Sequence, residues 1–448
     1  MRSWSLQDLR RQFKSPTLLS ADLRVLGVAV DSRNVRPGDL FFALEGAKQD
    51  GHDFIAAAAS KGAVAAVVKN SYSNSDLQIP LLHVENPLLM LQEMAASALR
   101  LFKGKIGAIT GSLGKTTTKG ILATLLKEKY RVAASPGNSN SQIGLPLAVL
   151  NHTSGDEEIL IFEMGITHAN QLPRLIEIAP PDIAVVTTIA PVHIANFPSL
   201  EELALAKAAI FSHPKTSIGI LSKDLPFFEP MSRIGTCQKI SFSVTQEASF
   251  SLIEENSQLK ITHCNQVHYL PPSNLPGAHN LHNLLAAVAA AKCFGMEWEE
   301  MQKGIPKLVL PEMRFEQVMK KGVLFINDSY NASEASIKAA LQCLPQVSQG
   351  GKKIAVLGDI VDLGNYATAC YQGIGEATLA HVDLLICLGK DCGMMVEAWK
   401  KAQRPVLWCH SLQEVVHELD RHMGVGDVVL LKGSNKHKLW EILNMVAT

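Results

Sequence analysis

The chain has 448 residues, with 42 Lys and Arg, 42 Asp and Glu, and a hydrophobic fraction of 47%. This length predicts two to four domains at roughly 100–200 residues each, and the composition excludes a disordered chain. The balanced charge gives no electrostatic case for a nucleic-acid or anionic-membrane partner. No apolar run reaches the ~18 residues of a membrane span, and the N-terminus lacks the apolar core of a signal peptide.

The eight cysteines include no C-x-x-C pair, which excludes the usual zinc and redox spacings. Several lie in apolar runs such as residues 384–389. We therefore expect buried free thiols in a reducing compartment. A cytoplasmic monomer is predicted.

Residues 1–86 are predicted to form a small mixed α/β domain. An Ala-rich helix at residues 53–61 lies among short apolar strands. The expected strands are residues 26–31, 39–44, 63–68 and 81–84. The Asn86–Pro87 step favours a turn and marks the end of this domain.

Residues 87–310 are predicted to form a central parallel sheet with helices on both faces. Strands and helices alternate with the lengths of βαβ units, and the strands are continuous apolar runs, as in sheets covered on both faces. The expected strands are residues 105–110, 159–163 and 183–189, and the expected helices are residues 88–103, 115–130, 169–178, 199–211 and 277–294. Residues 217–270 show more alternation of apolar and polar residues than the preceding strands, which predicts several antiparallel strands or an insertion.

Residues 311–448 are predicted to form a smaller, Rossmann-like doubly wound domain after a linker bracketed by Pro306 and Pro311. Its expected strands are residues 323–327, 353–357, 384–388, 405–409 and 427–431, and its expected helices are residues 334–344, 367–380, 393–402 and 412–422. The predicted fold class is therefore α/β with three domains.

The strongest local signal is the run TGSLGKTT from Thr110 to Thr117, which follows a strand and opens a helix. Glycines let backbone amides converge on an anion, and a helix N-terminus adds its positive end. Lys115 would reach the β- and γ-phosphates of a nucleotide, and Thr116 would ligate Mg²⁺. Only the second half of the phosphate-loop consensus is present, because Ile109 replaces its first glycine. The alternative is a glycine turn before an ordinary helix.

Two candidate metal ligands follow expected strands of the same domain. Glu163 ends the strand at residues 159–163, and His193 comes just after the strand at residues 183–189. Ligands gather at the carboxyl ends of strands in open α/β sheets. One carboxylate and one imidazole could therefore hold a divalent cation near the phosphates, although each residue taken alone could be an ordinary core or surface group.

The order of these motifs resembles the Mur ligase family of ATP-dependent amide-forming enzymes over nearly the whole chain. The residues that carry the resemblance are Asp31-Ser32-Arg33, Pro37–Phe41, Asp50-Gly51-His52, Thr110–Thr117 with Lys119, Pro136–Asn140, Ile143–Pro146, Glu163-Met164-Gly165, His193, Lys207, Gly277–Asn283, Asp328–Asn331 and Leu431–Ser434. The phosphate loop and residues 328–332 resemble the member that adds a dipeptide. The resemblance implies addition of D-alanyl-D-alanine to UDP-N-acetylmuramoyl tripeptide through an acyl phosphate, with ATP and Mg²⁺.

The resemblance also implies roles for individual residues. The catalytic set is Lys115, Glu163, His193, Lys207 and Arg314. ATP is assigned to Thr110, Gly111, Ser112, Gly114, Lys115, Thr116, Thr117, Lys119, Asn280, Asn283, Arg314, Asp328 and Tyr330. Two Mg²⁺ sites are assigned to Thr116, Glu163, His193 and Lys207, the last as a carbamate formed with CO₂. The UDP-sugar peptide and the dipeptide are assigned to Asp31, Ser32, Arg33, Gly51, His52, Asn138, Asn331, Lys432 and Ser434.

Several of these residues have simpler interpretations from the sequence alone. Lys207 could be a solvated helix lysine, Arg314 a surface arginine, and Tyr330 a packed loop aromatic. Asp31–Arg33 could be a strand-end turn, and the asparagines of residues 277–283 could be polar groups on a helix surface. The rival functions are another amino-acid ligase of the same family, a P-loop phosphoryl transferase, and a nucleotide-binding scaffold without turnover.

The chain departs from the family pattern at four places. The family's His-Leu-Glu reads His193-Ile194-Ala195, which removes a carboxylate, and Asp362 stands where Glu is common. The segments Ser333-Glu334 and Asn435–Lys438 also differ. We expect the ATP chemistry to be intact and the dipeptide contacts to differ in detail.

Overall fold

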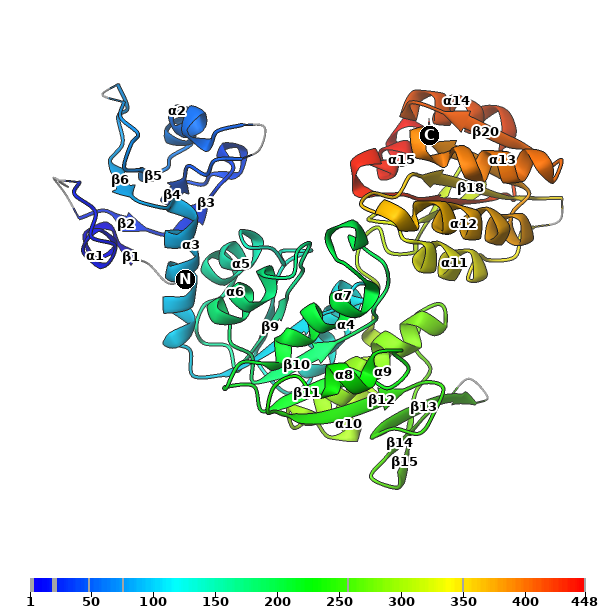
Figure 1. Cartoon of the computed structure of the whole chain (residues 1–448), viewed down its shortest axis with the longest axis horizontal. Helices are drawn as coiled ribbons and strands as arrows, with labels where there is room; N and C mark the ends of the chain where they lie inside the picture. Colours follow the sequence, from blue (N-terminus) through cyan, green and yellow to red (C-terminus); the bar gives the residue numbers. More distant parts are fainter. Residues whose placement is uncertain are drawn as a thin grey trace.

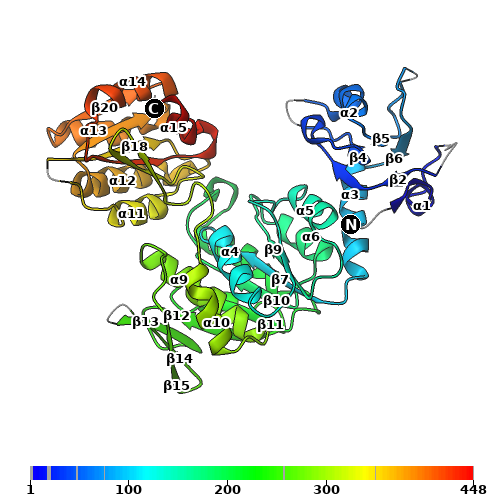
Figure 2. The same ribbon diagram turned by 180° about the vertical axis from the view of Figure 1, so that it is seen from behind.

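The computed structural model describes residues 4–17, 22–46, 49–74, 76–255, 258–348 and 350–446. The chain folds into three α/β domains, as predicted (Figures 1 and 2). The N-terminal domain, drawn in blue, and the C-terminal domain, drawn from yellow to red, are both joined to the central domain.

The N-terminal domain is built on a parallel sheet with the order β3-β4-β5-β6. These strands are β3 (Gly27–Ala29), β4 (Asp39–Phe42), β5 (Ala65–Lys69) and β6 (Leu81–Val84), and they correspond to the four predicted strands. The helix α2 (Ile55–Ser60) was also predicted. The antiparallel pair β1 (Trp4–Ser5) and β2 (Arg24–Val25) and the helix α1 (Leu6–Gln12) were not.

The helix α3 (Pro87–Arg100) connects this domain to the next one. The Asn86 side chain accepts a hydrogen bond from the Leu89 backbone N–H at 3.0 Å. Asparagine is a preferred N-cap, and proline suits the first helical position because no partner is available there for its missing N–H. The predicted turn at Asn86–Pro87 is thus the start of a helix.

The central domain contains a nine-stranded sheet with the order β15-β14-β13-β12-β11-β10-β7-β9-β8. Its strands are β7 (Lys105–Thr110), β8 (Val132–Ala134), β9 (Ile159–Glu163), β10 (Ile183–Val186), β11 (Ile218–Ser222), β12 (Gln238–Ser243), β13 (Phe250–Glu255), β14 (Gln258–His263) and β15 (Gln266–Leu270). The sheet is parallel from β8 to β13 and antiparallel from β13 to β15. The antiparallel strands predicted within residues 217–270 therefore extend the parallel sheet, which is mixed rather than wholly parallel.

Helices cover both faces of this sheet, because successive strand residues point to opposite sides. In β9, Leu160 and Phe162 enter the core beneath α3, α5 (Gly144–His152), α6 (Gln171–Ile178) and α7 (Leu200–Ala208). The neighbouring Ile159 and Ile161 enter the core beneath α4 (Lys115–Leu126), α9 (Ala278–Cys293) and α10 (Trp298–Gly304). The short helix α8 (Phe228–Ser232) follows β11.

The C-terminal domain has a six-stranded sheet with the order β16-β17-β21-β18-β19-β20. Its strands are β16 (Glu316–Lys320), β17 (Val323–Asn327), β18 (Lys353–Gly358), β19 (Leu384–Leu388), β20 (Val406–Cys409) and β21 (Val428–Lys432), and its helices are α11 (Glu334–Gln342), α12 (Ala367–His381), α13 (Gly393–Lys401), α14 (Leu412–His422) and α15 (Ile442–Met445). All pairs are parallel except β16 with β17. The doubly wound prediction is confirmed, with one antiparallel edge strand added.

Two expectations about membrane spans and cysteines can be compared with the structure. Across the described ranges, no helix combines the length and apolar character needed to cross a bilayer. All eight cysteines are free thiols. Four of them, Cys370, Cys387, Cys392 and Cys409, are buried in the C-terminal domain.

Candidate active site

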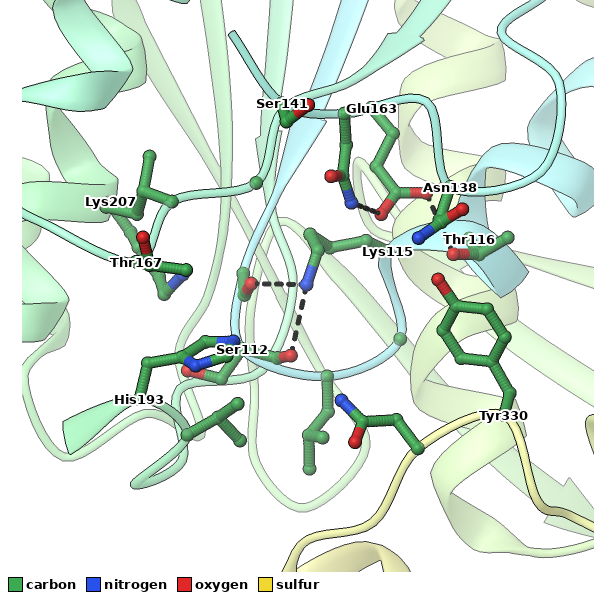
Figure 3. A pocket seen from close by; sticks show the side chains of 18 of the residues that line it. Ser112, Lys115, Thr116, Asn138, Ser141, Glu163, Thr167, His193, Lys207 and Tyr330 are labelled. Atoms are coloured by element: carbon green, nitrogen blue, oxygen red, sulfur yellow. Dashed lines mark hydrogen bonds between the residues drawn. The ribbon is translucent and has the colours of Figure 1, made fainter. Parts of the chain in front are cut away.

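A cavity of about 370 Å³ opens at the carboxyl ends of β7, β9 and β10 (Figure 3). The central domain lines it with the loop from Gly111 to Thr116, and the C-terminal domain adds Arg314 and Tyr330. Further lining residues are Asn138, Asn140, Ser141, Gln142, Glu163, Thr167, Gln171, His193, Lys207, Asn331 and Ser336. The sequence analysis assigned many of these residues to one site, and the fold brings them together.

The phosphate loop depends on glycine at two positions. Gly111 and Gly114 have φ values of +144° and +80°, which side-chain-bearing residues rarely adopt. A Cβ on Gly111 would lie 2.0 Å from the Thr187 hydroxyl oxygen, and one on Gly114 would lie 2.1 Å from Asn283 Oδ1. The loop therefore fits its neighbours only without these side chains.

Residues just after β10 form hydrogen bonds with the backbone of the loop. The Ser112 backbone N–H donates to the Thr188 carbonyl at 2.7 Å, and the Thr187 hydroxyl donates to the Leu113 carbonyl at 2.6 Å. The sequence analysis placed residues 187–189 in a strand and gave them no role. The strand β10 instead ends at Val186, and Thr187 and Thr188 form hydrogen bonds with the loop.

Lys115 curls against its own loop. Its Nζ donates to the carbonyl oxygens of Gly111 at 2.9 Å and Ser112 at 3.1 Å. Burial lowers the pKa of Lys115, as does the Arg314 charge, whereas Glu163 raises it. The Ser112 hydroxyl is buried and has no partner among the described residues. An unpaired donor and a cation beside curled amides are the groups that a phosphate would satisfy.

Glu163 is held in one orientation beside Thr116. The Thr116 hydroxyl donates to Glu163 Oε2 at 2.8 Å, and Asn140 Nδ2 donates to Oε1 at 2.6 Å. A hydroxyl and a carboxylate oxygen are hard ligands that suit Mg²⁺. Asn140 belongs to a quoted motif but not to the predicted site residues. Only the fold shows its contact with a carboxylate 23 positions away.

Two predicted nucleotide ligands lie behind the cavity. Lys119 Nζ donates to the Ser135 and Gly137 carbonyls at 2.7 and 2.5 Å and lies 3.7 Å from Glu163 Oε2. Burial lowers the pKa of Lys119, and Glu163 opposes this effect. The Thr110 hydroxyl donates to the Met164 carbonyl at 2.7 Å. In this structure both side chains form hydrogen bonds with backbone carbonyls near Glu163.

Lys207 on α7 lines the cavity (Figure 3), although the residue is only 3% exposed. It makes no hydrogen bond or ion pair with any described residue. Burial lowers its pKa well below the usual range, and the nearby Lys115 charge adds to this effect. A buried ammonium without a partner is costly. The solvated-lysine interpretation is wrong, because the residue is buried. Burial favours the neutral amine, which is the form that reacts with CO₂.

His193 also lines the cavity and is drawn on the same side of it as Lys207, away from Thr116 and Glu163 (Figure 3). Its Nδ1 is 2.9 Å from Asp362 Oδ2 of the C-terminal domain. Within the described ranges, no three His, Cys, Asp or Glu side chains converge to form a metal cage. Mg²⁺ needs no such cage, because it takes one or two protein ligands together with phosphates and water. The side chains present therefore fit Mg²⁺ bound with a nucleotide.

The C-terminal domain contributes a cation–π pair to the lining of the cavity. The Arg314 guanidinium lies 4.1 Å from the centre of the Tyr330 ring. Arg314 is flanked by Met313 and Phe315, both in the left-handed region with φ values of 56° and 57°. Burial raises the pKa of Tyr330, and Arg314 opposes this effect. The pair places a cation at the cavity, where the surface-arginine interpretation predicted none.

A second cavity of about 180 Å³ adjoins the loop on the α9 side. It is lined by Leu113, Gly114, Thr117, Thr188, His279, Asn280, Asn283, Leu310, Arg314, Phe315, Asp328, Ala335, Ser336, Ala339, Ala340 and Lys432. Asn280 and Asn283 are 2% and 4% exposed, and Asn283 Nδ2 donates to Asn280 Oδ1 at 3.2 Å. The helix-surface interpretation of these asparagines is therefore wrong.

Lys432 ends β21 and lines this cavity, and Ser434 lies two residues after it. Lys432 Nζ donates to Asp328 Oδ2 at 2.5 Å and to the Asn331 carbonyl at 3.2 Å. Burial lowers the pKa of Lys432, and Asp328 opposes this effect. The Ser434 hydroxyl is buried without a partner in the described part of the chain. Lys432 thus ties two loops together, and Ser434 keeps a free hydroxyl.

A third cavity, of about 360 Å³, lies between the N-terminal and central domains. Asp31, Asn34, Arg36 and Asp39 line it from one side, and α5 lines it from the other. Ser32 and Arg33 are not among its lining residues. Arg33 pairs with Asp31 at 2.6 Å, which with a backbone hydrogen bond lowers the pKa of that carboxyl.

Gly51 and His52 lie away from that cavity. A Cβ on Gly51 would lie 2.5 Å from the Leu44 nitrogen, so glycine is required there. His52 Nδ1 is 2.6 Å from Asp50 Oδ1, and the Lys69 backbone N–H donates to Nε2 at 3.3 Å. Both ring nitrogens of His52 therefore have partners inside the domain. The substrate role of these two residues stays a prediction.

Comparisons with known proteins give the chain's family. Residues 109–291 match the Mur ligase middle domain, residues 313–435 the glutamate ligase domain of Mur ligases, and residues 24–98 the catalytic domain of the Mur ligase family. The chain is 31% identical to the UDP-N-acetylmuramoyl-tripeptide–D-alanyl-D-alanine ligase of Bacillus subtilis, over 93% of this chain and 92% of that protein. The chain belongs to the Mur ligase family.

Other relatives of this Mur ligase have a similar sequence or the same fold. The ligase with the same description in Escherichia coli is 31% identical over 84% of this chain and 83% of its own. The crystal structure of the MurF ligase of Thermotoga maritima in complex with ADP is 28% identical, with a TM-score of 0.79 over 94% of this chain and 96% of that one. MurF from Acinetobacter baumannii, at 24% identity, shares the fold, with a TM-score of 0.86 over 100% and 99% of the two chains.

Proposed function

We propose that this Mur ligase joins D-alanyl-D-alanine to UDP-N-acetylmuramoyl tripeptide and converts ATP to ADP and phosphate in the same reaction. The relatives with this activity match nearly the whole chain at about the same identity. The observation that carries the proposal is the first cavity, where the phosphate loop, Glu163, Lys207 and the Arg314–Tyr330 pair meet. A site with these residues would bind and transfer phosphoryl groups where the central and C-terminal domains meet.

The reaction has two steps that both need negative charge to be neutralised. The tripeptide carboxylate attacks the γ-phosphorus, and the bond to the β-phosphate oxygen breaks, giving an acyl phosphate and ADP. The dipeptide amine then attacks the acyl carbon, loses a proton, and displaces phosphate. Both steps bring anions together, so positioning and electrostatic stabilisation are the protein's main contribution.

In the proposed site, Lys115 and the loop amides would hold the β- and γ-phosphates. Thr116 and Glu163 would hold one Mg²⁺, and His193 with carbamylated Lys207 a second. Mg²⁺, when bound, would neutralise negative charge on the phosphate groups. Carbamylation changes Lys207 from a cation to an anion with oxygen ligands. Arg314 reaches the phosphates only when the C-terminal domain is docked, which also excludes water from the acyl phosphate.

The substrates would occupy the remaining cavities. We propose that adenine enters the second cavity, beside Asn280 and Asn283, and that the uridine diphosphate enters the third, beside Asp31. The dipeptide would meet Asn331 and the unpartnered Ser434 hydroxyl at the carboxyl ends of the C-terminal strands. The free thiols support a cytoplasmic location, and a monomer is proposed.

Phosphate release measured with each component omitted in turn tests this function. We expect release only when Mg²⁺-ATP, the tripeptide acceptor and D-alanyl-D-alanine are all present, together with a pentapeptide product by mass spectrometry. Release that ignores the dipeptide would contradict the amine and favour another ligase of the family. Release that yields a stable phosphorylated acceptor would favour a phosphoryl transferase.

A further inference from the structure

Two turns from different domains interlock at the edge of the first cavity. One follows β10 and contains His193 and Ala195, and the other follows β18 and contains Asp362. Asp362 Oδ2 lies 2.9 Å from His193 Nδ1, and the Ala195 backbone N–H donates to the Asp362 carbonyl at 3.1 Å. A single residue of the C-terminal domain therefore contacts both the side chain and the backbone of the His193 turn.

The backbone of both turns is specialised for this approach. His193 and Asp362 are in the left-handed region, with φ values of 57° and 59°. Histidine and aspartate adopt this region more often than most residues do. A Cβ on Gly364 would lie 3.2 Å from Ala195 Cβ. The two turns can approach this closely because residue 364 has no side chain and residue 195 carries only a methyl group.

The hydrogen bond at Nδ1 decides which nitrogen of His193 faces the cavity. With the proton on Nδ1 donated to Asp362, the lone pair on Nε2 is free to bind a cation. Metal-binding histidines commonly donate their other N–H to a carboxylate, which fixes both the tautomer and the ring orientation. Here the carboxylate comes from a different domain than the histidine.

We propose that Asp362 is a positioning residue that prepares His193 as a cation ligand, so that the site of His193 and Lys207 is completed only across the domain boundary. This role rests on the cation function proposed above for His193. It differs from an ordinary ion pair between half-exposed side chains, which contributes little and has no effect on a metal. Docking of the C-terminal domain would thereby raise the cation affinity of the central domain.

Mn²⁺ binding followed by electron paramagnetic resonance tests this role without catalysis. The full chain is titrated with Mn²⁺ in the presence of a non-hydrolysable ATP analogue and bicarbonate. We expect Asp362→Ala to weaken Mn²⁺ binding at the site of His193 and Lys207 by about 10–100-fold and to leave the site at Thr116 and Glu163 unchanged. Asp362→Asn should have a smaller effect, because asparagine tolerates the left-handed backbone and its amide oxygen still accepts the hydrogen bond.

The matched control is Asp420→Asn on α14, an exposed aspartate without a partner in the described part of the chain. Mn²⁺ binding by this variant should equal that of the wild type. His193→Ala should weaken the same site, and adding Asp362→Ala to it should cause no further loss, because Asp362 acts through the ring of His193.

The outcomes separate the two proposals. Unchanged Mn²⁺ binding in His193→Ala would contradict the cation role of His193 and, with it, the role of Asp362. Weakened binding in His193→Ala with unchanged binding in Asp362→Ala would overturn the positioning role alone. A loss from Asp362→Ala that persists in full in the His193→Ala background would also overturn it. Near-ultraviolet circular dichroism of each variant shows whether the fold is kept.

Discussion

Replacing Lys207 by methionine should stabilise the protein while abolishing its activity. The side chain is 3% exposed, and its amine has no partner among the described residues. An unsatisfied buried polar group costs about 1–3 kcal/mol, and methionine fills similar space without it. For a domain of 150–250 residues, each kcal/mol raises Tm by about 2–4 °C. We therefore expect Lys207→Met to unfold several degrees above the wild type in CO₂-free buffer.

The pH dependence follows from the direction of the pKa shift. Because burial lowers the pKa of Lys207 in the folded state, the unfolded chain binds more protons between that pKa and the ordinary lysine value. Wild-type stability should therefore rise with pH through this window, and this contribution should be absent in Lys207→Met. Added bicarbonate should stabilise only the wild type, because only its neutral amine can form a carbamate.

Lys119→Met is the matched control for this experiment. Lys119 is also buried, but its amine has carbonyl partners and lies 3.7 Å from buried Glu163. Removing it leaves a buried carboxylate without its cation, which costs about 3–5 kcal/mol. Scanning calorimetry should thus show opposite changes in Tm for the two variants. A Lys207→Met protein that is less stable than the wild type without CO₂ would refute the reasoning.

Three further substitutions test the nucleotide site. Lys115→Ala should reduce phosphate release at least about 100-fold with an unchanged circular dichroism spectrum, and near-wild-type turnover would contradict the phosphate-loop role. Gly114→Ala places a Cβ 2.1 Å from Asn283 Oδ1 at a φ of +80°, so calorimetric titration should show a loss of ADP binding; wild-type affinity would mean the loop is not the binding site. Arg314→Ala removes the cation 4.1 Å from the Tyr330 ring, and kcat should fall more than the affinity for ADP; an equal fall in both would indicate a binding role only.

The local pattern of the chain predicted most of the secondary structure. Long apolar runs with turn signals located nearly all the strands of the parallel sheets, because a strand buried on both faces must be apolar throughout. Elements with little periodicity were missed. The strands β1, β2 and β8 have only two or three residues, and β16 has two exposed residues at its start.

The sequence by itself determined the three-domain α/β plan and the glycine-containing loop between β7 and α4, which it predicts to bind phosphate. These features depend on residue type and short spacing, which are present before the chain folds. The sequence could not show which lysines near these motifs face a cavity and which have internal partners. Lys115 and Lys207 face the first cavity, whereas Lys119 and Lys432 are committed to internal partners.

Only the tertiary structure decided those differences, because burial and long-range partners depend on how distant segments cross. The same holds for the contact between His193 and Asp362, which joins residues 169 positions apart in two domains. Nothing in the sequence of either turn indicates that the other turn will contact it. The geometry of the proposed cation site is therefore a property of the assembled domains, whereas the residue types available to it are a property of the chain.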